Sequence, residues 1–481
     1  DIKLCSGLET IYAYAFYNCT GIKTITLPDT LTQIAYSAFE RCSSLQSIVI
    51  PDNVKGIYEN TFTSCKSLKS VSIGKNCATI APTAFSSTTA LEKITVSADN
   101  EKYSSVDGAL LNKEKTSIIL YPKSKSGEFV IPDTVTSIAD RAFSSCPNLT
   151  KITIGANVES VGAYAFSECI ALTDVVFKDS TIDKKTIGNY AFYNCRALSN
   201  INFGNAVTSI GDYAFVMTES LTSIEFPDSL VRIGNYAFSP YSNGYGGSYI
   251  EYTTSNLENI KFGSGIKTIG KQAFYKNEKL KSIDLTGSNL TLIDTGAFQN
   301  CISLIEINLS GNNLVIESSA FYDDKYLKNV TFGAGIKSIG SNAFYNCLSI
   351  SELNFFDGLD RIYSDAFRNC KSISLVTLPN TLSSIGNSAF YNCERITSVH
   401  IPDKVTEIQG GCFTNCHLLK KVTIGSGCTS ISPTAFTGAN SIEEIIVEED
   451  NKKYTSVDGV LYNNDKTTLV LYPKGRRGNF T

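Results

Sequence analysis

The sequence predicts an α/β solenoid, a single array of short stacked coils, each with a short strand, a second extended run and a single helical or 3₁₀ turn. Three observations predict this fold. The dipeptide Ala-Phe or a close variant recurs about seventeen times, mostly in steps of 23 residues. Apolar residues and Cys keep fixed offsets from each Phe. Finally, a chain of 481 residues ordinarily divides into three or four domains, whereas this period runs from end to end.

Each unit reads A-F-x-x-C-x-x-L-x-x-I-x-I-P-x-x-V-x-x-I-G. In the unit that begins at Phe39, the two-residue alternation before Pro51 predicts a strand, and Pro51 ends it because proline lacks the donor that a ladder needs. The segment V-x-x-I-G predicts a second extended run, and x-x-A-F-x-x-C predicts a turn of helix or 3₁₀ that carries Phe inward. No unit can bury its apolar residues alone, so stacking at about 4.8 Å should place Phe on Phe and Cys on Cys.

This repeat resembles the BspA-like type of leucine-rich repeat, whose unit has the form L-x-x-L-x-L-P-x-x-L-x-x-I-G-x-x-A-F-x-x-C. The match covers nearly the whole chain. The resemblance implies a right-handed leucine-rich-repeat solenoid with a parallel sheet on its concave side and short strands on its convex side. It also implies a secreted or cell-surface protein that works in adhesion or host interaction.

Departures from the period mark insertions into the single array expected for 1–481. Tyr103–Pro122 contains two apolar runs around a polar turn, which predicts a hairpin, and a similar sequence recurs 351 residues later at Tyr454–Pro473. We therefore expect hairpin insertions at 97–128 and 448–479. A third insertion, at 239–256, is rich in Tyr, Ser and Gly. The second hairpin ends where the first continues into another repeat, so we expect the chain to stop within a further unit.

Eleven of the 15 cysteines stand three residues after the repeated Phe. A disulfide ladder or a metal array are possible alternatives, but we expect buried thiols that pack as small hydrophobic groups. Zinc is disfavoured because Cys412, Cys416 and His417 lack a fourth ligand nearby. Asn precedes seven of these cysteines and is expected to bond to the backbone of the turn.

Composition and motifs argue against several classes of function. A net charge of -4 with 18% charged residues gives no field for nucleic acid, and no apolar run approaches the roughly 18 residues of a membrane helix. Only two histidines are present, and no phosphate-binding loop, zinc helix or nucleophile elbow occurs. We therefore expect no catalysis, no cofactor and no metal, and a monomeric chain whose leader and anchor lie outside it.

Outward side chains of the strands are the candidate binding surface. Ten residues after each repeated Phe, short polar residues prevail, and a central stretch concentrates amide and charged side chains. The hypothetical ligand-binding residues of this stretch are Asn202, Glu225, Lys261, Asp284, Asn308 and Asn354. The loop insertion, expected to enter the same region, adds Tyr241, Tyr245, Tyr249 and Tyr252, because Tyr offers large amphipathic contacts at low entropic cost.

These features favour a non-catalytic extracellular binding module, adhesin-like, that presents a polar sheet face and a Tyr-rich loop to host or matrix proteins or to a glycan. A structural stalk, in which other parts of a larger surface protein bind, is the first alternative. Carbohydrate recognition is the second, and it would favour exposed aromatic residues along the sheet. The outward row at ten residues after Phe contains none.

Overall fold

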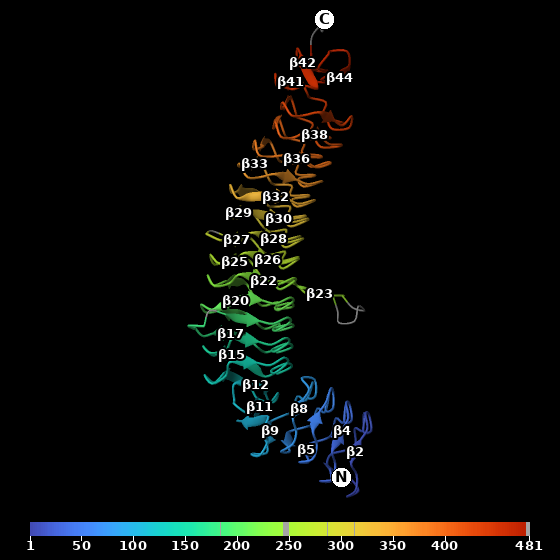
Figure 1. The fold of residues 1–481 in the computed structure, drawn as a ribbon, viewed down its shortest axis with the longest axis vertical. Coiled ribbons are helices and arrows are strands. Elements are labelled where there is room, and N and C mark those ends of the chain that lie inside the picture. The colour runs from blue at the N-terminus through green and yellow to red at the C-terminus, as the bar shows by residue number, and fades with distance from the viewer. Residues whose placement is uncertain (183, 244–249, 286, 312, 478–481) are drawn as a thin grey trace. The chain divides into compact units, whose positions relative to one another are not determined.

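The structure, a computed structural model, describes every residue except 183, 244–249, 286, 312 and 478–481. The chain divides into two compact units, Asp1–Leu221 and Thr222–Thr481. Each unit is a stack of coils with parallel strands (Figure 1). The predicted solenoid of stacked coils is therefore confirmed within both units.

Each coil contributes two strands to two different sides of its stack. The L-x-x-I-x-I segment forms what we call the major strand, in which inward side chains are buried and outward ones exposed, as in Ser47–Ile50. The V-x-x-I-G segment forms a shorter minor strand, such as Gly56–Ile57. Equivalent residues of neighbouring coils pair in register, so Ile48 faces Val71 and Ile57 faces Ile80. The 23-residue period is thus the register of the sheets.

In the first unit the major strands pair as β1–β3, β5–β7–β9 and β13–β15–β17–β19, and the minor strands pair as β2–β4, β6–β8 and β12–β14–β16–β18–β20. The major strands are β1 (Ile2–Lys3), β3 (Ile25–Thr26), β5 (Ser47–Ile50), β7 (Ser70–Ile73), β9 (Lys93–Val96), β13 (Gly127–Val130), β15 (Leu149–Ile154), β17 (Asp174–Phe177) and β19 (Asn200–Asn202). The minor strands are β2 (Thr10–Ile11), β4 (Gln33–Ile34), β6 (Gly56–Ile57), β8 (Thr79–Ile80), β14 (Ser137–Ile138), β16 (Ser160–Val161), β18 (Lys185–Ile187) and β20 (Val207–Ile210).

In the second unit the longest runs are β21–β25–β27–β29–β31 for the major strands and β22–β26–β28–β30–β32–β34–β36 for the minor strands. The major strands are β21 (Ser223–Glu225), β25 (Asn259–Lys261), β27 (Ser282–Asp284), β29 (Glu306–Leu309), β31 (Asn329–Phe332), β33 (Glu352–Asn354), β35 (Leu375–Thr377), β37 (Ser398–Ile401), β39 (Lys421–Ile424) and β41 (Glu444–Val447). The minor strands are β22 (Arg232–Ile233), β26 (Thr268–Ile269), β28 (Leu292–Ile293), β30 (Leu314–Ile316), β32 (Ile336–Ile339), β34 (Arg361–Ile362), β36 (Ser384–Ile385), β38 (Glu407–Ile408) and β40 (Ser430–Ile431).

A column of stacked phenylalanines forms the core of each unit. The rings of Phe166 and Phe192 lie 5.0 Å apart at an interplanar angle of 3°, and those of Phe344 and Phe367 lie 5.3 Å apart at 4°. These phenylalanines have no exposed surface. Burying a ring in every coil supplies the apolar area that one coil lacks by itself.

The turn that carries Phe is not helical, so this part of the prediction is wrong. Among the described residues the turns contain neither an α-helix nor a 3₁₀-helix. Residues two before and two after Phe take positive φ, as at Ser37 (53°) and Arg41 (63°). This conformation points amide groups at the next coil, and Phe39 N donates to Thr61 O at 3.0 Å. The amides alternate in this way along the turn, because Glu40 N bonds within the turn to Ser37 O at 3.2 Å whereas Arg41 N bonds to the next coil, and a 3₁₀-helix would keep all of these bonds internal.

The first hairpin insertion contains three antiparallel strands, β10 (Tyr103–Val106), β11 (Ala109–Asn112) and β12 (Ser117–Leu120). Its last strand pairs in parallel with the minor strand β14. Tyr121 then takes the place of a core Phe, with its ring 4.7 Å from that of Phe143. The insertion therefore ends in a further coil that the Ala-Phe pattern does not reveal. The second insertion forms β42 (Tyr454–Val457), β43 (Val460–Asn463) and β44 (Leu469–Leu471).

A buried asparagine holds each of these insertions. Asn100 donates from Nδ2 to Gly74 O and Cys77 O, both at 2.9 Å. Its Oδ1 accepts from Lys102 N at 2.9 Å and from Tyr103 N at 2.8 Å. Asn451 makes the equivalent four bonds in the second copy. The sequence signal for this role is the shared D-N-x-K-Y of the two copies.

Candidate functional site

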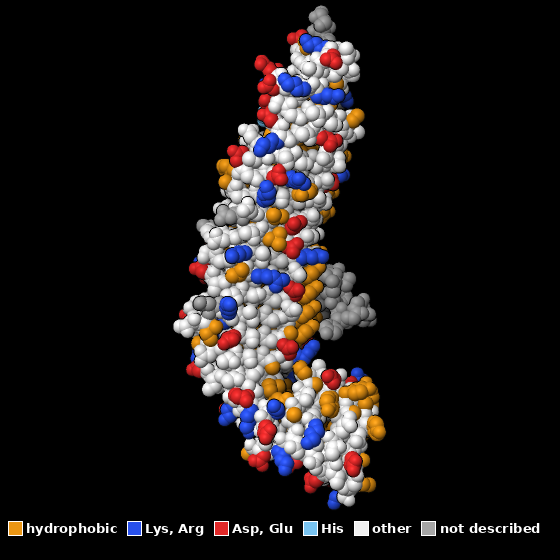
Figure 2. Space-filling model, viewed as in Figure 1, with side chains coloured by type: hydrophobic (Ala, Val, Ile, Leu, Met, Phe, Trp, Pro, Cys, Tyr) orange, Lys and Arg blue, Asp and Glu red, His pale blue; other side chains and the backbone are white. Residues whose placement is uncertain are grey.

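The outward side chains of the major strands form an exposed surface that we call the major face. Alternation along each strand creates it, because the inward residues occupy the core. Charged side chains of both signs are scattered over the visible surface rather than gathered into one field (Figure 2). A macromolecule bound here would therefore meet short polar groups and charges of both signs.

The structure places the six predicted polar residues on this face, and all are exposed. Asn202 lies on β19 of the first unit. In the second unit, Glu225, Lys261 and Asp284 lie side by side on β21, β25 and β27. Asn308 and Asn354 lie on β29 and β33. The five positions of the second unit thus share one face.

The charges in this row are paired with each other. Lys261 Nζ contacts Glu225 Oε1, and this hydrogen bond raises the pKa of Lys261. Further pairs link neighbouring coils in the same way: Lys69–Glu92, Lys151–Glu128, Lys281–Glu258, Lys420–Glu443 and Lys421–Glu444. Pairs this exposed contribute little to stability, because water and salt screen them. Their main effect is to leave the major face with small local charge.

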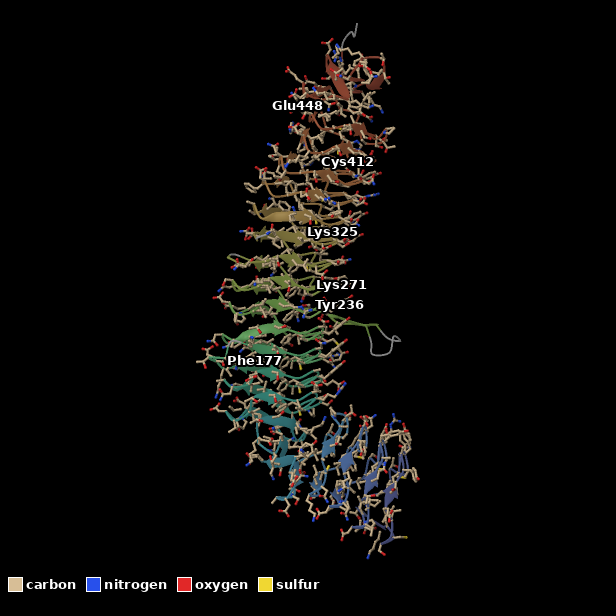
Figure 3. The ribbon with its side chains drawn as sticks, in the orientation of Figure 1. Phe177, Tyr236, Lys271, Lys325, Cys412 and Glu448 are labelled. Carbon is tan, nitrogen blue, oxygen red and sulfur yellow. The ribbon has the colours of Figure 1, made fainter. Side chains whose placement is uncertain are left out.

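The Tyr-rich insertion lies elsewhere. Its strands β23 (Tyr241–Asn243) and β24 (Ile250–Tyr252) form an antiparallel hairpin in which Tyr241 faces Tyr252. Tyr245 and Tyr249 lie outside the described residues. β23 lies across the stack from β25 and β27 (Figure 1), on the side where Tyr236 and Lys271 are found (Figure 3). The hairpin therefore does not join the major face.

A cavity of about 410 Å³ opens at the base of this hairpin. Thr253 N donates to Pro240 O at 3.2 Å and closes the hairpin there. The returning segment is held by Lys279 Nζ, which donates to Asn256 Oδ1 at 2.6 Å. The cavity is lined by residues at the two ends of the insertion, including Pro240 and Thr253, and by Lys276 and Glu278 of the next turn.

Asparagines form a ladder along the turns of the second unit. Nδ2 of Asn346 donates to Asp323 Oδ1, and Asn369, Asn392 and Asn415 each donate to the residue one coil earlier, all at 2.8 Å. The expectation that these side chains bond to turn backbone is thus wrong for this ladder. Their positive φ explains the residue type, because Asn tolerates the left-handed conformation.

Aromatic side chains on the turns stack on each other. The rings of Tyr164 and Tyr190 lie 4.7 Å apart, those of Tyr190 and Tyr213 lie 4.8 Å apart, and the guanidinium of Arg141 lies 4.3 Å from the centroid of Tyr164. Neighbouring rings cover the faces that would stack on a sugar. The ladder presents ring edges, which is an arrangement typical of packing between coils.

The cysteine column behaves as buried thiols. All 15 cysteines are free. Cys65 Sγ donates to Phe39 O at 3.1 Å, and Cys370 Sγ donates to Phe344 O at 3.0 Å, so each thiol bonds to the previous coil. Burial raises the pKa of Cys65 to about 12. A neutral thiol is a weak nucleophile and a weak metal ligand, so Cys65 supports the fold. Cys146 differs, because against the effect of burial a hydrogen bond with Cys169 and the nearby Lys123 lower its pKa.

Several coils place another residue in the cysteine column, and two of these residues are Asn277 and Asp324. Asn277 Nδ2 donates to Phe274 O at 2.8 Å and to Phe238 O at 3.1 Å. Asp324 is fully buried, and its Oδ1 accepts from Cys301 N at 2.8 Å. Its Oδ2 has no hydrogen-bond partner among the described residues. Burial raises the pKa of Asp324 well above its ordinary value.

A groove of about 380 Å³ crosses the ends of β5, β7 and β9. Val49, on the rim, is 64% exposed, whereas Ile50 and Ile73 beneath it are buried. Hydroxyl groups of Ser72 and Thr95 lie 3.0 Å apart along the groove. The remaining lining is Asp29, Pro51, Asp52, Gly74, Val96 and Ser97. The sequence signal is Val49 itself, an apolar residue in a row that is mostly polar.

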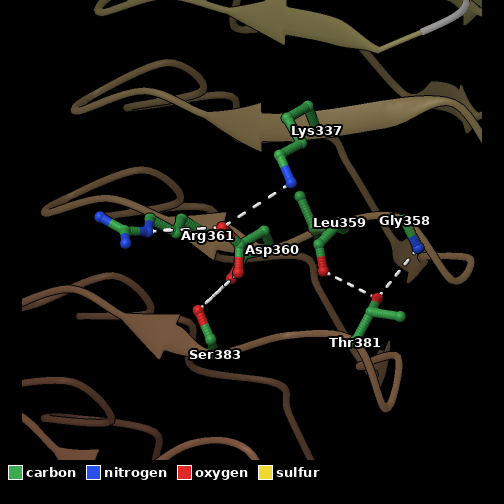
Figure 4. A network of polar contacts seen from close by, with 7 residues as sticks. All are labelled: Lys337, Gly358, Leu359, Asp360, Arg361, Thr381 and Ser383. Atoms are coloured by element: carbon green, nitrogen blue, oxygen red, sulfur yellow. Dashed lines mark hydrogen bonds and ion pairs between the residues drawn. The ribbon is translucent and has the colours of Figure 1, made fainter.

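Minor strands carry a polar network of their own (Figure 4). Asp360 accepts from Ser383 Oγ at 2.6 Å and lies 3.9 Å from Lys337 Nζ and 3.5 Å from Arg361 Nε. The hydrogen bond from Ser383 is the main cause of a lowered pKa at Asp360. The network joins three successive coils through groups that satisfy one another, which indicates a role in stacking.

In the part of the chain that the structure describes, no group of three or more His, Cys, Asp or Glu is arranged to hold a metal ion. The same residues include no helix with the length and apolar character needed to cross a membrane.

Known proteins share the repeat over most of the chain. The family model described as the BspA type leucine rich repeat region matches residues 1–106, 120–243, 247–374 and 337–467. No curated protein matches. A leucine-rich repeat protein from Bacteroides ovatus is 25% identical, with a TM-score of 0.49 over 84% of this chain and 87% of that one. A leucine rich cell surface protein from Faecalibacterium prausnitzii is 20% identical, with a TM-score of 0.38 over 78% and 98%. The pneumococcal vaccine antigen PcpA is 17% identical, with a TM-score of 0.41 over 75% and 88%.

Proposed function

The chain belongs to the family with BspA-type leucine-rich repeats, and from that premise we propose that it is a non-catalytic extracellular binding module. Its action is adhesin-like, in that the major face and the β23–β24 hairpin contact host or matrix proteins. Its location is secreted or at the cell surface, in keeping with the resemblance of the repeat. No cofactor takes part.

One observation carries the proposal over a structural stalk, namely the groove across β5, β7 and β9. A spacer needs only a closed, solvated surface. Here an apolar floor opens beside Val49, which leaves a large aliphatic side chain in water. Concave sites with an apolar floor and a few polar groups are the usual form of binding sites.

The paired charges of the major face determine how such a module would bind. Because Glu225 and Lys261 neutralise each other, long-range attraction is weak and affinity comes from many modest contacts. Several copies on one surface would multiply that affinity without any new contact.

A glycan ligand is less favoured than a protein. Sugar rings stack on exposed aromatic faces. In the ladder Tyr164–Tyr190–Tyr213, however, the rings stack on one another, so neighbouring rings occupy these faces. The stalk alternative retains support from the repeated pairs between coils, such as Lys420–Glu443, which hold neighbouring coils together without any ligand.

The experiment is a capture assay of the immobilised full chain against a panel of extracellular-matrix proteins and glycans. The double variant Asn308→Arg, Asn354→Arg adds bulk to the major face, and Thr406→Arg, an exposed position just before the minor strand β38, is the control. We expect at least one matrix protein to be captured, and its capture to be weakened only by the double variant. Failure to capture any protein would refute the assignment, and capture that ignores the double variant would exclude a contact at β29 and β33.

A further inference from the structure

The two units contain copies of one local structure, 351 residues apart. In the first, Val49 pairs with Ser72 and Ser72 with Thr95 across β5, β7 and β9. In the second, His400 pairs with Thr423 and Thr423 with Ile446 across β37, β39 and β41. The backbone continues alike, since Ser97 N bonds to Ile73 O and Glu448 N bonds to Ile424 O. The groove of the first unit thus has an equivalent position in the second.

The two copies have the same residues at the positions that shape the backbone around the groove. Pro51, Asp52 and Gly74 of the first groove correspond to Pro402, Asp403 and Gly425. Asp52 Oδ1 accepts from Lys75 N at 2.9 Å, and Asp403 Oδ1 accepts from Ser426 N at 2.7 Å. A Cβ on Gly74 would meet the backbone of Pro51 at 2.7 Å, so glycine is required for this close approach. The framework is structural in both copies.

What differs is the rim and one hydroxyl of the lining. Val49 corresponds to His400, Ser97 to Glu448, Asp29 to Asn380 and Thr95 to Ile446. His400 Nδ1 lies 3.8 Å from Glu448 Oε1, and this contact passes over the intervening coil of Thr423. Figure 3 shows Glu448 on the side of the second unit away from Lys325. In the second unit, therefore, the chain's own side chains bridge the position that is open in the first.

The lining of the open groove fits one kind of side chain. Aliphatic surface from Val49, Pro51 and Val96 can cover a methylene stem, and the hydroxyls of Ser72 and Thr95 face the same space. Carboxylates of Asp29 and Asp52 border it, and Lys75 Nζ stands 3.8 Å from Asp52. Lys and Arg side chains lay their stems along apolar surface and keep the cationic head beside acceptors. A basic side chain therefore satisfies both parts of the lining.

We propose that the groove bordered by Val49, Asp29 and Ser97 binds a Lys or Arg side chain from a basic segment of a protein ligand, and that the contact between His400 and Glu448 closes the duplicate groove. This inference rests on the proposed function and names the partner chemistry of one part of the major face. One chain then carries one open site and one closed site. The two sites differ in charge or polarity at four lining positions, which are Asp29, Val49, Thr95 and Ser97 in the open site.

The first test measures binding of a fluorescein-labelled pentapeptide, Lys-Ser-Lys-Ser-Lys, to the full chain by fluorescence anisotropy at 150 mM salt. A Glu-Ser-Glu-Ser-Glu peptide is the charge control. Asp29→Asn should weaken binding of the lysine peptide about threefold to tenfold. Asp99→Asn removes the same charge from an exposed position outside the groove lining and should have no effect. Equal weakening by both variants, or equal binding of both peptides, would overturn the proposal.

The second test exchanges the rims. The double variant Val49→His, Ser97→Glu should close the first groove and reduce peptide binding more than about tenfold. The quadruple variant Asn380→Asp, His400→Val, Ile446→Thr, Glu448→Ser should raise the stoichiometry from one peptide per chain to two. Thermal melts confirm that each variant folds. If a rim exchange prevents folding, Asp29→Asn still decides the question. Unchanged affinity and stoichiometry in folded variants would show that the rims do not control access.

The result is separable from the proposed function. If matrix proteins are captured but Asp29→Asn and the rim exchange have no effect, the groove assignment fails and the binding module stands. If no matrix protein is captured while the lysine peptide binds as described, the groove stands and the adhesin-like function fails.

Discussion

Replacing the buried Asp324 by Asn should stabilise the second unit at neutral pH. The change is nearly isosteric, so Oδ1 can still accept from Cys301 N, as it does in the structure at 2.8 Å. The new amide can donate to carbonyl groups of its own and the previous coil, as Asn277 does in the same column. A net gain of about 1 kcal/mol per hydrogen bond gives about 2 kcal/mol, before any relief of the buried carboxyl is counted.

The carboxyl adds a dependence on pH. Burial raises the pKa of Asp324 above 3.8, so the folded chain retains a proton that the unfolded chain releases. The stability that this proton confers is complete below pH 3.8 and is lost as pH rises toward the raised pKa, by at most about 1.4 kcal/mol per pH unit. Asn does not titrate, so in the variant this slope disappears and the advantage of Asn grows with pH.

Native-state hydrogen exchange is the suitable measurement, because long repeat arrays open in parts rather than in one two-state step. Protection of amides in the coils from 298 to 347 should rise in Asp324→Asn at pH 7 and should lose its decline between pH 4 and 7, after correction for intrinsic exchange. Asp357→Asn, exposed in the same unit, is the control. Equal protection in wild type and variant at pH 7 would refute the argument from burial.

Three further predictions concern other parts of the chain. Phe344→Ala removes a fully buried ring that stacks on both neighbours and should cost about 3 to 5 kcal/mol by urea denaturation; a loss below about 1 kcal/mol would contradict the stacked core. Asn100→Ala breaks four hydrogen bonds and should lower the local stability of the first insertion by about 2 to 4 kcal/mol, which is detected as faster proteolysis between β10 and β12. Asn451→Ala should open the second insertion in the same way, with faster proteolysis between β42 and β44. Deleting 241–252, so that Pro240 and Thr253 are joined, should leave the thermal melt nearly unchanged and weaken capture of a protein ligand, whereas a ligand that ignores the deletion would exclude the hairpin.

The period, the core column and the two strands of each coil could be predicted because they follow from inward residues. Each of these positions repeats one residue type, and one buried Phe per coil fixes the register of all the others. Tyr121 shows the limit of this approach, since it fills a core position without the Ala-Phe signal and so hides a coil inside the insertion.

The turn could not be predicted correctly because alternate amides in it bond to the next coil. A spacing of three residues suits a 3₁₀-helix, and the internal bond from Cys42 N to Phe39 O fits one, but nothing in one unit shows that Phe39 N donates to the next coil. Asn before Cys was the available clue, since it favours positive φ. The same residues could have predicted the asparagine ladder, in which register rather than local sequence brings Asn346 and Asn369 together.

The site could be predicted only in part, and the reason lies in the repeat itself. Outward positions are under no constraint from the core, so polar residues there are expected whether or not they bind anything. Glu225 and Lys261 illustrate this, because they looked like ligand contacts and the structure pairs them with each other. An outward residue is informative when its type differs both from most residues at the same position of the repeat and from the residue at the equivalent position 351 residues away. Val49 and His400 depart in both ways, and their coils contain, respectively, an open groove and a bridge across the equivalent position.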